Sequence, residues 1–194
     1  MAQKKVKTEC SGLEWSQFLV LIDRLKKDKN YRFLLFIGIG SYAGLRCGDI
    51  LSLRWQDIVG KSEIIINENK TGKSRTITIN QSLVEIINHC YQIQAKIDTN
   101  LHDFIFCNRT GSKLSIQYIN RQLDKLFHKY HIKAQNYSSH ILRKTFGRRC
   151  YEMHGKSPES LVLLNEIFGH SSISITRSYI GLSQEKIQNV YISL

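Results

Sequence analysis

The sequence has little proline, few acidic side chains and no long apolar run. Pro158 is the single proline, and 16 Asp and Glu stand against 28 Lys and Arg, for a formal net charge of +12. No apolar stretch reaches the ~20 residues of a membrane-spanning helix, and no apolar segment follows the basic start as in a secretory signal. We therefore expect a cytoplasmic protein without a membrane partner.

The sequence also lacks a disulfide framework and a metal site. Its five cysteines are odd in number and include no Cys-x-x-Cys pair, which fits buried thiols in a reducing cytosol. His128 and His131 lie three residues apart, but this pair is not a convincing metal site, and satisfied or solvated histidines are the simpler interpretation. We expect no metal ion and no other cofactor.

The length and the composition favour one globular domain. A chain of 194 residues with 42% apolar residues can bury a substantial core. The excess of positive charge indicates a polyanionic partner, of which nucleic acid is the commonest. Basic surfaces also occur on proteins that only stay soluble, so charge alone leaves both interpretations open.

Apolar periodicity predicts a mainly α-helical α+β fold with one small antiparallel hairpin. The segment 31–42 is apolar on nearly every side and should lie in the core. The strands are expected at 62–69 and 74–80. The helices are expected at 13–27, 31–42, 49–58, 81–97 and 116–130, from His140, from Pro158, and up to Tyr179.

Arg46 lies in a tight joint between two of these helices. Gly48 is expected to cap the second helix, which places Asp49 in the first turn, where the helix dipole favours an acid. Asp49 is the nearest candidate partner of Arg46. On this segment alone, a structural pair of Arg46 and Asp49 is the simpler interpretation.

Basic residues gather at the tip of the predicted hairpin. Thr71-Gly72 marks the turn, and Lys70, Lys73 and Arg75 surround it. An ordinary solvated turn accounts for this pattern. The functional alternative is a flexible finger that carries a lysine toward a phosphate.

His140 and Arg143 are three residues apart near a predicted helix start, so both project from one face. The N-terminus of a helix offers unpaired N–H groups and a positive dipole, which suit a phosphate. Lys144 and Arg148 are expected to extend this basic face.

The stretch 168–181 contains a Gly-His turn and a tyrosine. Gly169 ends one predicted helix, His170 lies in the turn, and the next helix, starting at Ser171 or Ser172, carries Tyr179.

These residue types suit the attack of a tyrosine on a DNA phosphodiester. Two arginines can hold the non-bridging oxygens with forked donors, and a histidine can add a hydrogen bond. A base must take the phenol proton, and a lysine can protonate the leaving 5′ oxygen. The phosphotyrosine bond then conserves the energy needed to rejoin the strand without ATP.

The order Arg, Lys, His-x-x-Arg, Gly-His, Tyr resembles the catalytic domain of the tyrosine recombinases, the phage integrase family. The resemblance covers roughly residues 13–183, through AGLRCGDILSLRWQDI, NKTGKSRTITI, HILRKTFGRRCYEMHG and IFGHSSISITRSYIG. It implies that Lys70, or else Lys73, is the catalytic lysine on the hairpin. The other implied roles are a nucleophile, Tyr179, a supporting acid, Asp49, and the catalytic residues Arg46, His140, Arg143 and His170.

The resemblance further implies a site-specific DNA recombinase, which forms a 3′-phosphotyrosyl intermediate during integration, excision or inversion. Double-stranded DNA is the expected partner, within the nucleoid. A tetramer on two DNA sites is expected, with residues 182–194 docking on a neighbouring copy. The DNA-binding residues would be Lys73, Arg75, Lys144 and Arg148.

Residues 1–10 are expected to be a basic tail and residues 11–194 the catalytic domain, with no separate N-terminal DNA-binding domain. This organisation fits an excised catalytic domain or a short stand-alone member such as the fimbrial-switch invertases. Two other functions remain open on the same fold: DNA relaxation of the type IB topoisomerase kind, and DNA binding without chemistry by a regulator.

Overall fold

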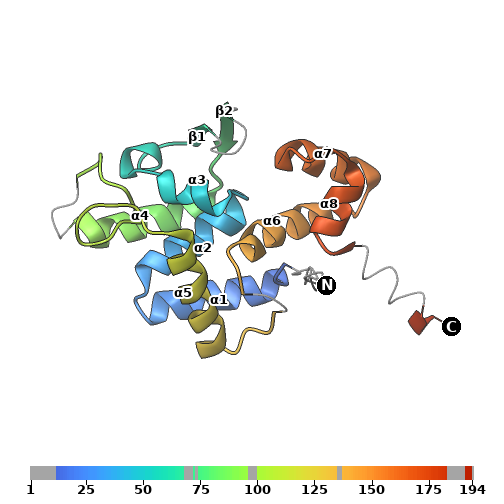
Figure 1. Cartoon of the computed structure of the whole chain (residues 1–194), viewed down its shortest axis with the longest axis horizontal. Coiled ribbons are helices and arrows are strands. Elements are labelled where there is room, and N and C mark those ends of the chain that lie inside the picture. The colour runs from blue at the N-terminus through green and yellow to red at the C-terminus, as the bar shows by residue number, and fades with distance from the viewer. Residues whose placement is uncertain are drawn as a thin grey trace, which may run out of the picture.

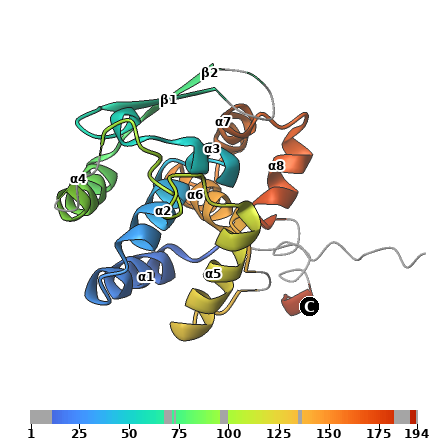
Figure 2. The same ribbon diagram turned by 60° about the vertical axis from the view of Figure 1, so that its left-hand side comes forward.

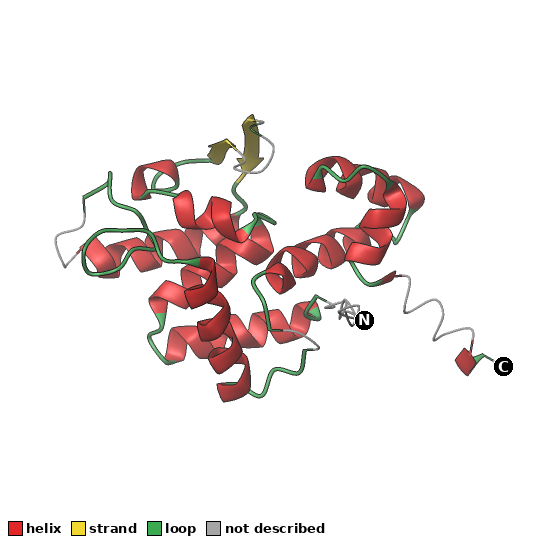
Figure 3. Cartoon of the chain, in the orientation of Figure 1, coloured by secondary structure: helices red, strands yellow, loops and turns green. Residues whose placement is uncertain are grey.

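The computed structural model describes residues 12–67, 72, 74–95, 100–134, 137–182 and 191–193. In this part of the chain, most residues are in helices and one small hairpin lies at the edge of the molecule, which confirms a mainly helical α+β fold (Figures 1 and 3). The elements, in order, are α1 (Trp15–Lys27), α2 (Tyr31–Tyr42), α3 (Cys47–Ser52), the 3-10 turn η1 (Trp55–Asp57), β1 (Glu63–Asn67), β2 (Ser74–Thr78), α4 (Gln81–Ala95), α5 (Ile116–Lys129), α6 (His140–Met153), α7 (Pro158–Phe168) and α8 (Ile173–Tyr179).

Helix α2 is the centre of the main core, as its apolar sequence predicts. Its residues from Phe33 to Ser41 are all buried, and α1, α4 and α6 pack around it. The Asn30 side chain accepts a hydrogen bond from the Phe33 amide and so caps the helix start. No helix in the described ranges has both the length and the apolar character needed to cross a bilayer.

A second, smaller apolar cluster lies beyond the main core. It consists of Leu161, Leu164 and Phe168 from α7 and Ile180 from the turn after α8. Figures 1 and 2 show α7 and α8 beside α6, which runs from the main body to this cluster. The candidate functional residues come both from the main body and from the part of the chain that forms the smaller cluster.

The hairpin forms as its alternating sequence predicts. β1 and β2 pair antiparallel, from Glu63 opposite Thr78 to Asn67 opposite Ser74. Ile64 and Ile66 are buried on the inner face of β1. Lys70 and Lys73, the two candidates for a catalytic lysine, lie outside the described residues.

The helix expected at 49–58 is much shorter in the structure. Arg46, rather than Gly48, occupies the N-cap position, and α3 ends at Ser52. The helix stops because the chain becomes extended to pair with a later segment: the Leu53 carbonyl accepts from the Ile105 amide at 3.1 Å.

Ile116 differs from the other apolar residues of its helix. It is the first residue of α5 and is 45% exposed. The buried face of α5 begins one turn later, at Ile119.

Gly147 allows α6 to pass close to the smaller cluster. A Cβ atom there would lie 2.7 Å from Phe168 Cζ and 2.8 Å from Ile180 Cγ2. We expect Gly147→Ala to lower the free energy of unfolding by about 1–2 kcal/mol, because overpacking outweighs the gain in helix propensity. Urea denaturation measures this change.

Gly38→Ala is the matched control, since Gly38 also lies within a helix. Its added Cβ would meet no atom closer than Ile86 Cδ1, the flexible end of that side chain, at 3.2 Å. We expect little loss of stability there, and equal losses in the two variants would contradict the packing argument.

Candidate functional site

The C-terminus of α7 is the point at which the candidate site is assembled. Gly169 adopts the left-handed conformation, with φ 63° and ψ 40°, which glycine adopts without strain. Two hydrogen bonds close the helix end: from the Gly169 amide to the Glu166 carbonyl and from the His170 amide to the Asn165 carbonyl, both 3.1 Å. The carbonyl groups of Ile167 and Phe168 lie at this helix end and are available to other donors.

Three arginines from separate parts of the chain donate to these two carbonyl groups. Arg46, at the start of α3, and Arg143, in α6, both reach the Phe168 oxygen, at 3.1 and 3.2 Å. Arg75, on β2, donates to the Ile167 oxygen. The negative end of the helix dipole favours cations here. The predicted convergence of Arg46 and Arg143 is therefore present in the structure.

Arg143 is held on several sides. It is only 3% exposed, and its guanidinium also donates to the Gly44 carbonyl. The Arg143 guanidinium carbon lies 4.6 Å from the centre of the Phe168 ring. These contacts pre-orient the guanidinium group.

Asp49, the predicted support of Arg46, is buried in the first turn of α3. Arg46 caps this same helix, so the two residues are one turn apart. The Arg46 guanidinium also donates to the Phe168 carbonyl, at 3.1 Å.

The Tyr179 ring packs against the ring of Phe168, the residue whose carbonyl accepts from Arg46 and Arg143. The centre of the Tyr179 ring is 5.3 Å from that of Phe168 and 5.1 Å from that of His170. Lys144 places its ammonium nitrogen 5.0 Å from the centre of the tyrosine ring, so a positive charge lies beside the phenol.

His170 is held by two residues that the sequence analysis missed. Its Nδ1 lies 3.0 Å from the Thr176 hydroxyl, which in turn lies 2.9 Å from Asn165 Oδ1. The Asn165 side-chain amide donates to the His170 carbonyl at 3.1 Å. Asn165 lies on α7 and Thr176 on α8, and no spacing rule in the sequence indicates that they meet.

His140 is the first residue of α6 and is exposed. It lies one helical turn before Arg143, on the same side of the helix start. The structure thus places the His-x-x-Arg pair as the sequence predicts, although the preceding Ser139 makes no side-chain capping bond.

Comparison with known proteins identifies the family of this chain. Residues 13–186 match the model of the phage integrase family. The chain belongs to the phage integrase family. Tyrosine recombinase XerH of Helicobacter pylori is 24% identical over 191 residues, covering 96% of this chain and 52% of XerH. The probable integrase/recombinase YoeC of Bacillus subtilis is 31% identical over 167 residues, 86% of each chain.

Solved structures show the same fold. XerH bound to a palindromic difH substrate, in a post-cleavage complex, superposes with a TM-score of 0.73 at 20% identity, over 98% of this chain and 55% of XerH. XerA recombinase gives a TM-score of 0.72 at 21% identity, over 94% of this chain and 64% of XerA. This phage integrase family member spans about half the length of the XerH relatives that it matches.

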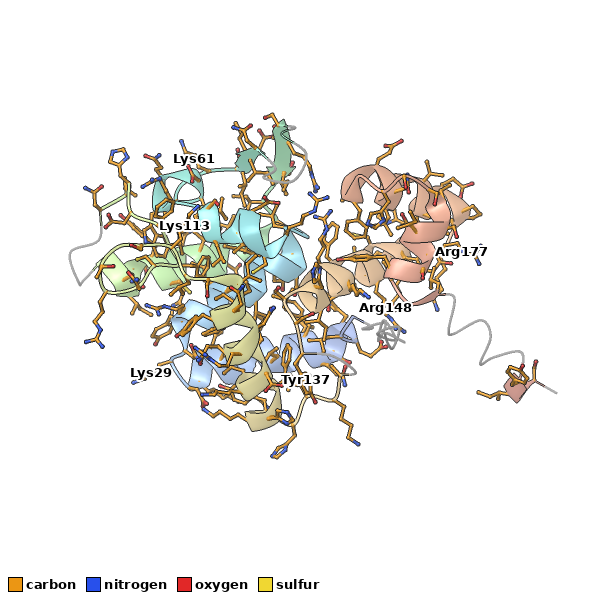
Figure 4. All side chains as sticks on the ribbon, viewed as in Figure 1. Lys29, Lys61, Lys113, Tyr137, Arg148 and Arg177 are labelled. Atoms are coloured by element: carbon orange, nitrogen blue, oxygen red, sulfur yellow. The ribbon has the colours of Figure 1, made fainter. Side chains whose placement is uncertain are left out.

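The basic residues expected on an open face of α6 are instead engaged within this integrase-family domain. Lys144 is only 8% exposed. Arg148, labelled in Figure 4, forms ion pairs with Glu14 at 2.9 Å and Glu152 at 3.2 Å. Lys144 and Arg148 therefore do not form the open basic surface that the sequence predicted. Their contact with DNA stays a prediction.

Two cysteines of this integrase-family domain, the buried Cys90 and the half-buried Cys150, are poor nucleophiles. Burial raises the pKa of the Cys150 thiol to about 11 and that of Cys90 to about 12, which suppresses the reactive thiolate. We expect iodoacetamide at pH 8 to alkylate both at least about a hundredfold more slowly in the folded protein than in urea. Mass spectrometry of the alkylated peptides measures these rates, and equal rates would contradict the proposed desolvation.

Proposed function

We propose that this chain is a tyrosine-type site-specific recombinase that cleaves and rejoins DNA strands, with Tyr179 as the nucleophile. The observation that carries the proposal is the meeting of Arg46 and Arg143 at one oxygen atom, the Phe168 carbonyl. An oxygen that accepts from two guanidinium groups marks a place suited to a phosphate oxygen. The rings of Tyr179 and His170 both contact the ring of Phe168.

In the proposed reaction, the Tyr179 oxygen bonds to the scissile phosphorus while the bond from phosphorus to the 5′ oxygen breaks. Arg46 and Arg143 exchange the Phe168 carbonyl for the non-bridging oxygens and stabilise their charge. Lys70 protonates the leaving 5′ oxygen, and His140 and His170 supply hydrogen bonds and the base for the phenol. A 5′ hydroxyl of the partner strand then reverses the step.

Asp49 and four basic residues are proposed to have supporting roles, which we infer from their positions. Buried Asp49 keeps the α3 start, and with it Arg46, in place. Lys73, Arg75, Lys144 and Arg148 are proposed to contact DNA, which for the last three requires exchange of intramolecular contacts for phosphates. Release of condensed counterions would make binding strongly salt-dependent. We place this activity on nucleoid DNA in the cytoplasm.

A selection from random DNA tests the proposed function. A library of nicked duplexes with a randomised site would trap the enzyme, because the short fragment beyond the cut diffuses away and prevents religation. Sequencing of the DNA attached to protein would identify the preferred site, and mass spectrometry would identify the attached residue. A recombinase attaches to a defined sequence, whereas relaxation of a supercoiled plasmid without that sequence would indicate topoisomerase activity. If no attachment occurs to any sequence, a non-catalytic regulator is the better account.

We further propose a tetramer on two DNA sites, joined through residues 182–194. A groove of about 350 Å³ between α6, α7 and α8 supports this proposal. Its apolar lining includes Val162, Ile173 and Leu182. The apolar side chains of Tyr191 and Ile192 are 75% and 82% exposed, so a second copy could cover them.

A charge in this groove should prevent assembly. We expect Val162→Asp to abolish tetramers on DNA while single-site cleavage continues, because a carboxylate would be desolvated under the docked segment. Light scattering after size-exclusion chromatography measures the assembly. Val20→Asp on α1 is the control, since Val20 and Val162 are 47% and 45% exposed. Tetramers that persist in Val162→Asp would exclude this groove.

A further inference from the structure

We propose that Asn165 and Thr176 are positioning residues that hold His170 in the tautomer with its proton on Nδ1. Nε2 is then the ring nitrogen that acts on the substrate or on the Tyr179 phenol. This inference rests on the proposed recombinase function and assigns roles to two residues for which the resemblance implied none.

The Asn165 amide has one possible orientation. Its Nδ2 donates to the His170 carbonyl at 3.1 Å, and its Oδ1 lies 2.9 Å from the Thr176 hydroxyl. A flipped amide would set Oδ1 against the His170 carbonyl oxygen, with no proton between the two acceptors. Oδ1 therefore faces Thr176 as an acceptor.

The single hydroxyl proton of Thr176 is consequently directed to Asn165. Thr176 is fully buried, with 0% exposure, so water does not supply an alternative partner. Its oxygen still offers lone pairs to His170 Nδ1, which lies 3.0 Å away. Two acceptors cannot satisfy each other, so Nδ1 must carry a proton and donate it to Thr176.

The two ring nitrogens of His170 therefore have different roles: Nδ1 donates to Thr176, and Nε2 is the nitrogen that can accept a proton. In the neutral ring, Nε2 has the lone pair and can take the phenol proton as the Tyr179 oxygen bonds to phosphorus and the 5′ oxygen leaves. Once protonated, Nε2 can donate to a non-bridging oxygen. The opposite tautomer would have a proton on Nε2 and could not accept another there.

The same chain of bonds ties the histidine to the nucleophile. Thr176 lies three residues before Tyr179 on α8, while Asn165 lies near the end of α7. Asn165 also accepts the His170 amide through its backbone carbonyl. The turn that carries His170 is thus bonded to both helices, which fixes the imidazole ring beside the Tyr179 ring.

Nitrogen NMR of the histidine-labelled protein tests the tautomer without DNA. The sequence has seven histidines, so the His170 signal is assigned by its loss in His170→Gln. At a pH where the ring is neutral, we expect the Nδ1–H tautomer in the wild type and in Thr176→Ser. In Thr176→Val, which lacks the hydroxyl, we expect a shift toward the Nε2–H form that free histidine favours in water.

Cleavage of the selected site gives the functional readout. We expect Thr176→Val and Asn165→Ala to cleave about ten- to a hundredfold more slowly than the wild type, and Thr176→Ser to cleave at a near-normal rate. Circular dichroism establishes that each variant is folded, and Thr176→Ser keeps the test valid if Val disrupts packing. An Nε2–H tautomer in the wild type, or normal cleavage in a folded Thr176→Val, would overturn the inference. Failure of the proposed function is a different result: no variant, including the wild type, would attach to DNA.

Discussion

Replacing Tyr179 by Phe is expected to abolish the covalent attachment of this protein to DNA. The change removes only the phenol oxygen, while the ring contacts with Phe168 and His170 can persist, so the fold and DNA binding should remain. Removal of a nucleophile typically lowers the rate by more than about 10⁴-fold. A labelled nicked duplex on a denaturing gel would show the adduct in the wild type and none in the variant.

Two other tyrosines serve as matched controls for this experiment. Tyr151 lies in α6, and Tyr191 lies in the described part of the C-terminal segment. Tyr151→Phe and Tyr191→Phe should form the adduct at the normal rate. An adduct that survives in Tyr179→Phe but disappears in one of these two variants would move the nucleophile there.

Arg143→Ala is expected to reduce cleavage by about 10³- to 10⁵-fold, the range known for arginines that stabilise a transferring phosphate. The guanidinium reaches the oxygen to which Arg46 also donates, so its removal leaves half of the proposed phosphate clamp. DNA binding should change much less, because most of the affinity comes from the phosphates of the whole contacted duplex. Single-turnover cleavage and filter binding separate the two effects.

Folding must be checked in this variant, because Arg143 is almost fully buried and its loss leaves the Gly44 carbonyl without that donor. Arg143→Lys is the companion variant: it retains the charge but lacks the forked donors, so an intermediate rate is expected. Arg177→Ala, on the outer side of α8 in Figure 4, should cleave normally. Normal cleavage by a folded Arg143→Ala would remove Arg143 from the site.

The parts of the fold that local sequence determines were predictable. The apolar segment of α2 and the alternating strands both encode their structure within a few neighbouring residues. The end of α3 was not predictable in this way. It depends on pairing between Leu53 and Ile105, about fifty residues later in the chain, which overrides the helical pattern.

The candidate site shows the same division. The order and types of Arg46, Arg143, His170 and Tyr179 resemble the motifs of one family, and the structure brings these four residues together around Phe168. The sequence did not indicate that a helix C-terminus collects the arginines. Nor did it indicate that Asn165 and Thr176 hold His170, since these contacts exist only after α7 and α8 pack together.

The central claim is that Arg46 and Arg143 neutralise the charge of a single phosphate for attack by Tyr179. Cleavage of a substrate with a neutral methylphosphonate at the scissile position tests this claim most directly, because it removes the charge that the arginines would stabilise. We predict that Arg143→Ala, nearly inactive on phosphate, recovers most of its cleavage on the methylphosphonate, with the adduct on Tyr179. The same deficit on both substrates would contradict the account.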